Sequence, residues 1–462
     1  MRRLAGRTSR LSRRSLGRGL AAVTFANLLF LALMVAAPGP PRVVATRIRT
    51  AYETGELGTL SYLRYDTRRG YFQHNDCLIL QMLSNQHSSM LERALAPKVY
   101  VKTTDHNPCA VLRAMVVERV DPKTLLLADR FTRYCHGYNA LTGFALRWME
   151  LGAFRRLLRA AVWLAIGLLA LATYRAGPVA RRTGLAIALA AATLWGVQYF
   201  APGLSQGPGD ALLLLGLATI AAWPRLAADV DTIVPYAAGF GAGVVFFEMF
   251  TGQLPTAIAW LAALTLAAAR DEERHGGADA PRVVLAAVTA FGLGAAATVL
   301  VKQILAVTLV GHLAPASFFE HLNLYMKDPQ DDQGRAGRIF ALVRLQRFLP
   351  LLRLFNRSGT LTFGNELVGR CLMLATLLAW LAVAIRGWRR RRTVEGRDLL
   401  ILMGAALVPV VWSFLLPHHT SIHAWLMVRI LVVPVSLAAV ALLWPRAGRS
   451  ADSRAPLPRA SP

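Results

Sequence analysis

The sequence is poor in cysteine and in acidic residues, and it lacks the common motifs of zinc and nucleotide sites. Its 462 residues include four cysteines, with no CxxC pair and no zinc-finger spacing. No GxxxxGK[ST] motif is present, which excludes the usual phosphate-binding loop of ATPases. Acids number 26 against 52 Lys and Arg, so the formal net charge is +26. No nucleic-acid-binding pattern accompanies this charge, and we expect no nucleic-acid partner.

What the sequence does contain is long apolar blocks that are nearly free of charge. Apolar residues make up 55% of the chain, whereas soluble domains contain about 45–50%. We therefore predict an all-α polytopic membrane protein with about ten transmembrane helices and a large first external loop that contains interfacial helices. The predicted spans are residues 20–37, 158–174, 183–200, 210–223, 233–250, 254–269, 283–301, 367–385, 399–416 and 422–444.

The distribution of arginine predicts the orientation of these helices. Residues 1–19 contain seven Arg and no acid, and cytoplasmic segments of membrane proteins are enriched in Lys and Arg. Residues 174–182 and 386–398 would lie on the same side, and they contain three and six Arg. The connections predicted on the opposite side contain no Lys or Arg: residues 201–208, 251–255 and 417–421. Both termini are therefore expected in the cytoplasm, and the high Arg, Ala and Leu content suggests a bacterial cytoplasmic membrane.

The predicted topology divides the chain into segments. They are a basic cytoplasmic N-terminus (1–19), a first transmembrane helix (20–37), an external loop domain (38–157), helices two to seven (158–301), a second external loop with a basic interfacial helix (302–366), helices eight to ten (367–444) and a cytoplasmic tail (445–462). A cleavable signal peptide is the alternative for the first helix, because small residues follow its apolar run. That run has eighteen residues, which exceeds the usual length of about 7–15 and favours a retained helix.

Acidic residues early in the first external loop are candidate catalytic bases. Glu53 and Glu56 follow the first span, and Asp76 stands directly before an apolar run. A carboxylate in such a position can take a proton from an acceptor hydroxyl. The alternative is structural, with Asn75 or Asp76 capping a helix that begins near Cys77.

Three of the four cysteines lie in the same loop: Cys77, Cys109 and Cys135. If the loop faces an oxidising compartment, any two of them can form a disulfide and leave the third free. The alternative is that all three are unpaired and pack as small apolar side chains.

Two basic amphipathic helices are predicted in the external loops, at residues 139–159 and 338–355. Each combines Arg with apolar residues in a pattern typical of a helix that lies on a membrane surface. In the second, Arg344 and Arg347 are candidates to bind the phosphate of a lipid or of a lipid-linked donor, because guanidinium pairs with phosphate through two parallel hydrogen bonds. The alternative for both helices is ordinary anchoring at the interface, so anionic membrane lipids are expected partners.

The clearest candidate site lies between the last two predicted spans. His418, His419 and His423 fall within six residues, and Arg429 lies about two turns into the final span. An Arg at that depth is costly unless it faces a partner or a wet cavity, so a substrate-binding role is expected. The alternative is a structural ion pair, for example with Glu248. We predict no cofactor; a divalent metal is an alternative that the adjacent His418 and His419 do not support, since both cannot easily converge on one tetrahedral ion.

These features together suit transfer of a group from a lipid-linked donor. With a large first external loop, a second large loop after the seventh span and many helices, the layout resembles the GT-C class of membrane glycosyltransferases. The resemblance implies a polyprenyl-phosphate-linked sugar donor and a glycan, lipid or protein acceptor at the outer face. It favours Asp76 as the base, with His423 and Arg429 toward the donor phosphate. The paired acids that this class has close behind its first span are absent here, and Glu53 with Glu56 is the nearest equivalent.

Two other functions are compatible with the same residues. A lipid or polysaccharide transporter or flippase would use Arg429, Glu248 and the histidines as a translocation or proton-relay path, although the sequence has no inverted-repeat signal. An O-antigen-ligase-like transferase would use external Arg and His on an undecaprenyl-pyrophosphate glycan.

Overall fold

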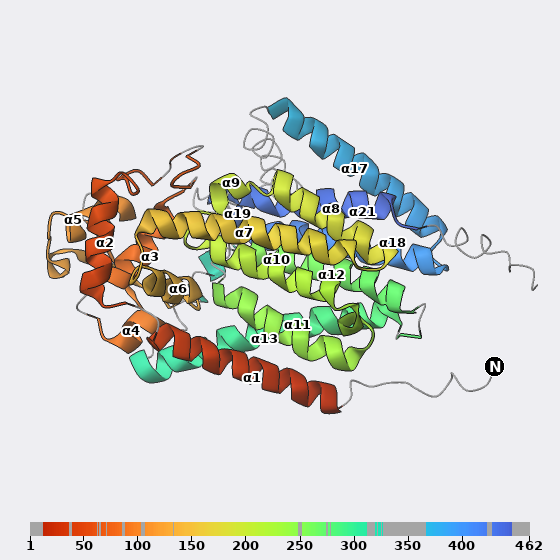
Figure 1. Ribbon diagram of the computed structural model, residues 1–462, viewed down its shortest axis with the longest axis horizontal. Coiled ribbons are helices and arrows are strands. Elements are labelled where there is room, and N and C mark those ends of the chain that lie inside the picture. The colour runs from red at the N-terminus through yellow and green to blue at the C-terminus, as the bar shows by residue number, and fades with distance from the viewer. Residues whose placement is uncertain are drawn as a thin grey trace, which may run out of the picture.

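The structure is a computed structural model in which a helical bundle carries a smaller domain at one end (Figure 1). Described residues are 13–36, 39–61, 63, 66–70, 72–85, 88–102, 107–132, 134–247, 252–273, 276–277, 279–311, 319–320, 322–324, 326, 366–422 and 427–445. Within them the chain is mainly helical and has only two short strands, in agreement with the all-α class expected from the sequence.

Each predicted span overlaps one helix of the bundle. These helices are α1 (Arg13–Ala36), α7 (Leu151–Tyr174), α8 (Pro178–Leu194), α10 (Gln206–Ala222), α11 (Val230–Phe247), α12 (Gln253–Glu273), α13 (Ala280–Val310), α17 (Glu366–Arg389), α18 (Val394–Leu415) and α21 (Val432–Leu442). Among the described residues six of these, α1, α7, α11, α13, α17 and α18, are long and apolar enough to cross a membrane. By length and composition the chain is thus a multi-pass, α-helical membrane protein.

The predicted count of ten spans is not confirmed, because several helices are short. Helices α8 and α10 have 17 residues each and α21 has 11, whereas a helix needs about 20 residues to cross the hydrocarbon core. Between α8 and α10 the chain makes a hairpin that contains the single-turn helix α9 (Val197–Phe200). Every residue from 201 to 210 is buried, so this α9–α10 hairpin ends inside the protein.

Close helix packing in the bundle depends on glycine. A Cβ atom at Gly241 of α11 would lie 2.1 Å from the carbonyl oxygen of Phe291, and one at Gly294 of α13 would lie 2.0 Å from that of Ala238. Neither position can hold a larger residue without moving a backbone, so α11 and α13 approach each other through small residues, as is common in membranes.

The predicted external loop forms the domain at the left of Figure 1, on the end of the bundle. Its elements are α2 (Pro41–Glu53), α3 (His74–Ser84), α4 (Met90–Leu95), β1 (Lys98–Val101), α5 (Pro108–Val116), β2 (Leu126–Arg130) and α6 (Gly137–Ala145). The two strands pair antiparallel. Leu151, Phe154 and Leu158 of α7 belong to the same hydrophobic cluster as the domain's own core, so domain and bundle are packed as one body along α7.

The structure resolves the alternatives for the loop cysteines. Cys77 of α3 and Cys109 of α5 form a disulfide, and Cys135 is a buried free thiol. Burial raises the pKa of Cys135 to about 11, so it is inert as a nucleophile at neutral pH.

The predicted amphipathic helix at residues 139–159 is instead two helices. Helix α6 ends at Ala145, and α7 begins at Leu151. Between them Glu150 has an extended backbone (φ −72°, ψ 155°) as the N-cap residue of α7, and its carboxylate pairs with Arg47 of α2. This contact with a distant helix fixes the break. The second predicted amphipathic helix, at residues 338–355, lies outside the described residues.

Candidate functional site

A buried ion pair joins the domain to the bundle. Asp76, in the first turn of α3, is completely buried. Its Oδ2 accepts a hydrogen bond from Nη2 of Arg155 at 2.7 Å, and its Oδ1 accepts one from the backbone N–H of Leu204 at 2.8 Å. Burial raises the pKa of Asp76, while the Arg155 charge and the two hydrogen bonds oppose this rise. Asp76 therefore connects α3, α7 and the α9–α10 hairpin.

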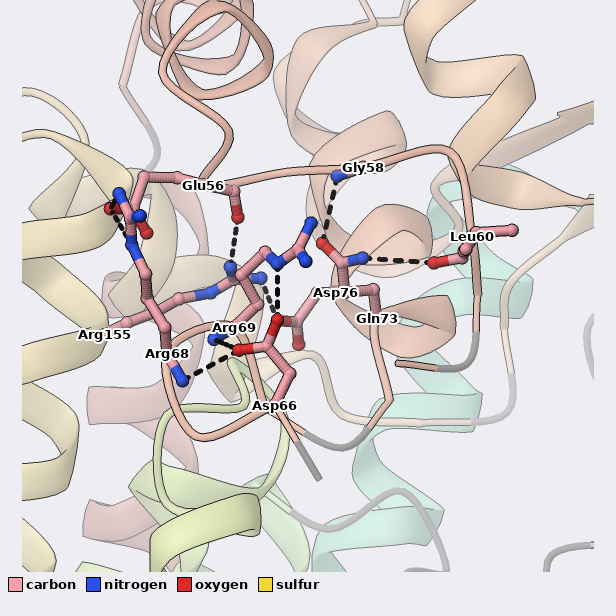
Figure 2. A network of polar contacts seen from close by, with 9 residues as sticks. All are labelled: Glu56, Gly58, Leu60, Asp66, Arg68, Arg69, Gln73, Asp76 and Arg155. Atoms are coloured by element: carbon pink, nitrogen blue, oxygen red, sulfur yellow. Dashed lines mark hydrogen bonds and ion pairs between the residues drawn. The ribbon is translucent and has the colours of Figure 1, made fainter. Parts of the chain in front are cut away.

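Helix α3 begins slightly earlier than the sequence predicted. Its first residue is His74 and Gln73 occupies the N-cap position, so neither Asn75 nor Asp76 is the N-cap. The Gln73 side chain instead closes the preceding loop, because its Nε2 donates to the carbonyl of Leu60 at 3.1 Å and its Oε1 accepts from the N–H of Gly58 at 3.3 Å (Figure 2). These bonds hold residues 58–60 over the start of α3.

Arg155 is the centre of the network in Figure 2. The sequence suggested an interfacial anchor, but this side chain is only 1% exposed. Its Nη1 donates to the backbone carbonyl of Glu56 at 2.5 Å, while Nη2 binds Asp76. Arg156, the next residue, is exposed. One guanidinium thus binds the carboxylate of Asp76 and the backbone of Glu56, two of the three acids that the sequence identified.

Glu56 is the more accessible of those two acids. Its side chain is 11% exposed, and Oε1 accepts hydrogen bonds from Nε and Nη2 of Arg68 at 2.9 and 2.6 Å. The Arg68 side chain is itself 64% exposed. The carboxylate lies against Gly152, where a Cβ atom would be 2.6 Å from Glu56 Cδ. Gly152 is in the first turn of α7, and a helix N-terminus stabilises a negative charge.

A tight turn holds Arg68 beside Glu56. Oδ1 of Asp66 accepts from the N–H groups of Arg68 and Arg69, both at 2.9 Å, and Oδ2 accepts from Nε of Arg69 at 2.7 Å. Partial burial acts to raise the pKa of Asp66, but these hydrogen bonds and the Arg69 charge bring it below its ordinary value. After the turn Gly70 has φ +89° and approaches the carbonyl of Tyr199, to which a Cβ would be 3.2 Å away. The turn therefore rests on α9.

The junction site combines acids with a larger number of arginines. It consists of the carboxylates Glu56, Asp66 and Asp76 and the guanidinium groups Arg68, Arg69, Arg155 and Arg159. Arg159 lies one turn beyond Arg155 on α7, and its Nε is buried without a hydrogen-bond partner among the described residues. The arrangement can offer a carboxylate to a hydroxyl group and guanidinium groups to a phosphate.

A second buried ion pair lies in the bundle. Arg429 pairs with Asp210, and the two side chains are 2% and 0% exposed. The sequence suggested Glu248 as the partner in the structural alternative, and Glu248 lies outside the described residues. The sequence analysis did not identify Asp210. An acid at the edge of a predicted span is itself a candidate functional residue, so its position could have indicated this role.

The guanidinium of Arg429 is enclosed by aromatic rings. Its Cζ lies 4.6 Å from the ring centroid of Trp195 and 4.9 Å from that of Phe200. Gln253 supports the acid, since its Nε2 donates to Asp210 Oδ1 at 2.8 Å. Nε and Nη1 of Arg429 are buried and have no hydrogen-bond partner among the described residues, so this guanidinium retains donors for another anion.

The two ion pairs flank the same hairpin. Asp76 binds the backbone of Leu204, and Asp210 follows six residues later at the start of α10. Phe72, just before α3, packs in one hydrophobic cluster with Phe200 of α9. The last apolar segment contributes Met427, Val428, Ile430 and Leu431 to the same cluster. The chain just before α3 and the segment that carries Arg429 thus meet in one small hydrophobic cluster.

The remaining predicted residues are only partly described. His419 lies on α19 (Pro417–Ile422) and is 2% exposed. The side chain of His418 lies outside the described part of the chain, as do His423, Arg344 and Arg347. In the described part no group of three or more His, Cys, Asp or Glu could hold a metal ion.

Comparison with known proteins gives no relative. No family model matches the chain, and neither the curated proteins nor the solved structures contain a match.

Proposed function

We propose that the protein is a membrane glycosyltransferase that moves a sugar from a polyprenyl-phosphate-linked donor to an acceptor at the membrane face that bears the domain. One observation carries the proposal: Glu56, a partly accessible carboxylate, lies among arginines where a folded domain meets membrane helices. In the proposed complex, the lipid tail of the donor lies along the membrane helices and its phosphate lies at this junction.

Glu56 serves as the base in the proposed reaction. It takes the proton of the acceptor hydroxyl while the acceptor oxygen bonds to the sugar C1, and the bond between C1 and the phosphate oxygen breaks. Both oxygens of Asp76 are engaged and the residue is fully buried, so the base is assigned to Glu56. Asp76 then acts through Arg155, which holds the Glu56 backbone.

The arginines stabilise the leaving polyprenyl phosphate. Arg68 is exposed and joined to Glu56, so a donor phosphate can draw its guanidinium away and free the carboxylate. Arg159 and Arg429 each have a buried Nε without a partner among the described residues. Guanidinium donors that bind a departing phosphate stabilise the negative charge that develops on it in the transition state.

The disulfide supports an external location for this chemistry. Disulfides persist in oxidising compartments and are rare in the cytosol, and Cys77–Cys109 lies one residue from Asp76. The bias of arginine toward the other connections favours the same orientation.

Lipid mass spectrometry combined with one substitution tests the proposal. We expect wild-type protein purified from a bacterial membrane to retain polyprenyl phosphate or its glycosylated form. Glu56→Gln should retain the glycosylated donor in excess and lose transfer by at least about 100-fold, the contribution typical of a general base. Glu118→Gln, on an exposed acid of the same domain, is the control and should behave as wild type. Absence of any polyprenyl phosphate from wild type and from Glu56→Gln would refute the proposal.

The Asp210–Arg429 pair favours a second function, movement of a charged lipid across the membrane, because buried charges in spanning segments often mark transport paths. In that case Arg429→Lys would stop substrate movement in proteoliposomes while Glu56→Gln left it unchanged.

A further inference from the structure

A groove opens on the outside of the bundle at the end opposite the domain. Helix α1 packs along α11 and leaves a cavity of about 520 Å³ between itself and α13. Gly19 and Val23 of α1 line one side, Ala238 of α11 lines the floor, and Ala290 and Gly294 of α13 line the other side. Gly294 lets α13 lie directly against the backbone of Ala238, so the groove lies over the line where α11 and α13 meet.

The groove is closed toward the middle of the bundle. Asn27, one turn beyond Val23, donates from Nδ2 to Oγ1 of Thr298 at 3.1 Å, and Thr298 is one turn beyond Gly294. Along α13 the lining runs from Arg282 to Ala297, which is about 22 Å at 1.5 Å per residue. One leaflet of the hydrocarbon core is about 15 Å deep, so the groove is long enough to span one leaflet but shorter than the whole core, and none of its lining residues belongs to the junction site.

Basic residues stand at the open end. Arg282 lines the groove itself. Arg13 lies three residues before Leu16 and seven before Leu20, which both line the groove, so the three share one helix face. Arg14 and Arg18 are exposed on the same two turns.

The acids at this end are partly engaged. They are Asp229, Asp231 and Asp279, at the starts of α11 and α13. Asp231 accepts a hydrogen bond from Ser15, and Asp229 accepts one from the N–H of Thr232 at 2.9 Å. An apolar groove with an arginine-rich mouth matches a ligand that has a hydrocarbon tail and an anionic head.

We propose that this groove binds one acyl chain of an anionic phospholipid, with the lipid phosphate at Arg282 and Arg13. The chain lies on Ala238 between Gly19 and Gly294, and the Asn27–Thr298 hydrogen bond limits its depth. Basic clusters next to membrane helices attract anionic lipid heads by about 1 kcal/mol per residue. This site is independent of the proposed transfer reaction.

Native mass spectrometry after exchange into defined lipids tests the site. Wild-type protein, incubated with equal amounts of phosphatidylglycerol and phosphatidylcholine of the same acyl chains, should retain one phosphatidylglycerol in at least tenfold preference. Ala290→Trp fills the groove and should reduce retention of both lipids at least tenfold. Arg282→Ala should remove the preference while retention of phosphatidylcholine persists.

Matched controls separate the site from general effects on the membrane surface. Leu377→Trp adds the same ring to an exposed face of α17, and Arg397→Ala removes an exposed arginine from the first turn of α18. Both should retain phosphatidylglycerol as wild type does. If Ala290→Trp does not yield folded protein, Ala297→Leu narrows the same groove and should give the same loss.

Three results would overturn the proposal. Wild type could retain phosphatidylcholine equally, the groove variants could retain phosphatidylglycerol as wild type does, or polyprenyl phosphate added to the mixture could displace phosphatidylglycerol. The last result would identify the groove as a site for the carrier lipid instead.

Discussion

Gly152→Ala should reduce activity strongly while leaving the fold intact. The new Cβ would lie 2.6 Å from Cδ and 2.7 Å from Oε1 of Glu56, distances that no carbon contact sustains. The Glu56 backbone cannot retreat easily, because Nη1 of Arg155 binds its carbonyl. The carboxylate must therefore move by roughly 1 Å and weaken its bonds to Arg68, and a displacement of about 1 Å can lower a rate about 100-fold.

The free energy of unfolding of Gly152→Ala should change little, because two effects oppose each other. Glycine in a helix is less favourable than alanine by about 0.5–1 kcal/mol, and the gain at Gly152 offsets part of the roughly 1–3 kcal/mol that overpacking costs. A Cβ atom added at Gly167, in the middle of the same helix, would have no neighbouring atom within 4 Å. Gly167→Ala should thus raise the melting temperature slightly and leave activity unchanged.

The assay compares both variants with wild type in proteoliposomes that contain the retained donor lipid. Transfer rate and thermal unfolding are measured on the same preparations. Wild-type activity in Gly152→Ala would refute the assignment of Glu56 as the base. Equal losses of activity in both variants would instead indicate a general effect on α7.

Three further predictions concern the domain. Asp76→Asn leaves Arg155 buried without its charge partner and should cost about 3–5 kcal/mol, seen as a lower melting temperature; an unchanged melting temperature contradicts the structural role. The double variant Cys77→Ser/Cys109→Ser opens a loop with a sequence separation of 32. By the chain-entropy argument it should lower the free energy of unfolding by about 3–4 kcal/mol. Addition of a reductant should lower the melting temperature of wild type and leave that of the double variant unchanged. Burial lowers the pKa of His74 from 6.5 to about 4, so the unfolded chain takes up a proton that the folded domain excludes: stability is full above pH 6.5 and decreases as the pH falls toward 4. His74→Gln should flatten this decrease in melting scans between pH 7 and 4.5, and an unchanged slope would contradict the burial argument.

The membrane helices were predictable because their signal is local. Each apolar block of the sequence corresponds to a helix of the bundle, and the boundaries differ mainly where arginine extends a helix. Helix α8 begins at Pro178 and includes Arg181 and Arg182, whereas the predicted span begins at residue 183, since arginine is a good helix former and its long side chain can reach water. Span count was harder to predict, because hydropathy does not distinguish a spanning helix from the buried hairpin around α9.

The partners of the buried charges were not predictable, because they are far apart in the sequence. Arg155 and Asp76 are 79 residues apart, and Arg429 and Asp210 are 219 residues apart. Arg155 and Arg156 look equivalent in a basic amphipathic pattern, yet one is buried and the other exposed. Only the position of α7 against the domain core decides between them.

The two buried pairs explain how the proposed base in the domain can keep a fixed position relative to the bundle. Removing two charges from water costs several kcal/mol per ion, so such pairs add little net stability, but a misaligned packing that separates them is strongly disfavoured. Asp76 reaches α7 and the α9–α10 hairpin, and Arg429 reaches the start of α10 from the last apolar segment. A shift of the domain along the bundle would break the first pair, and a shift of the last segment would break the second. Glu56, whose carbonyl is bound by Arg155, is thereby held at a set position against the bundle, as the proposed reaction on a lipid-anchored phosphate requires.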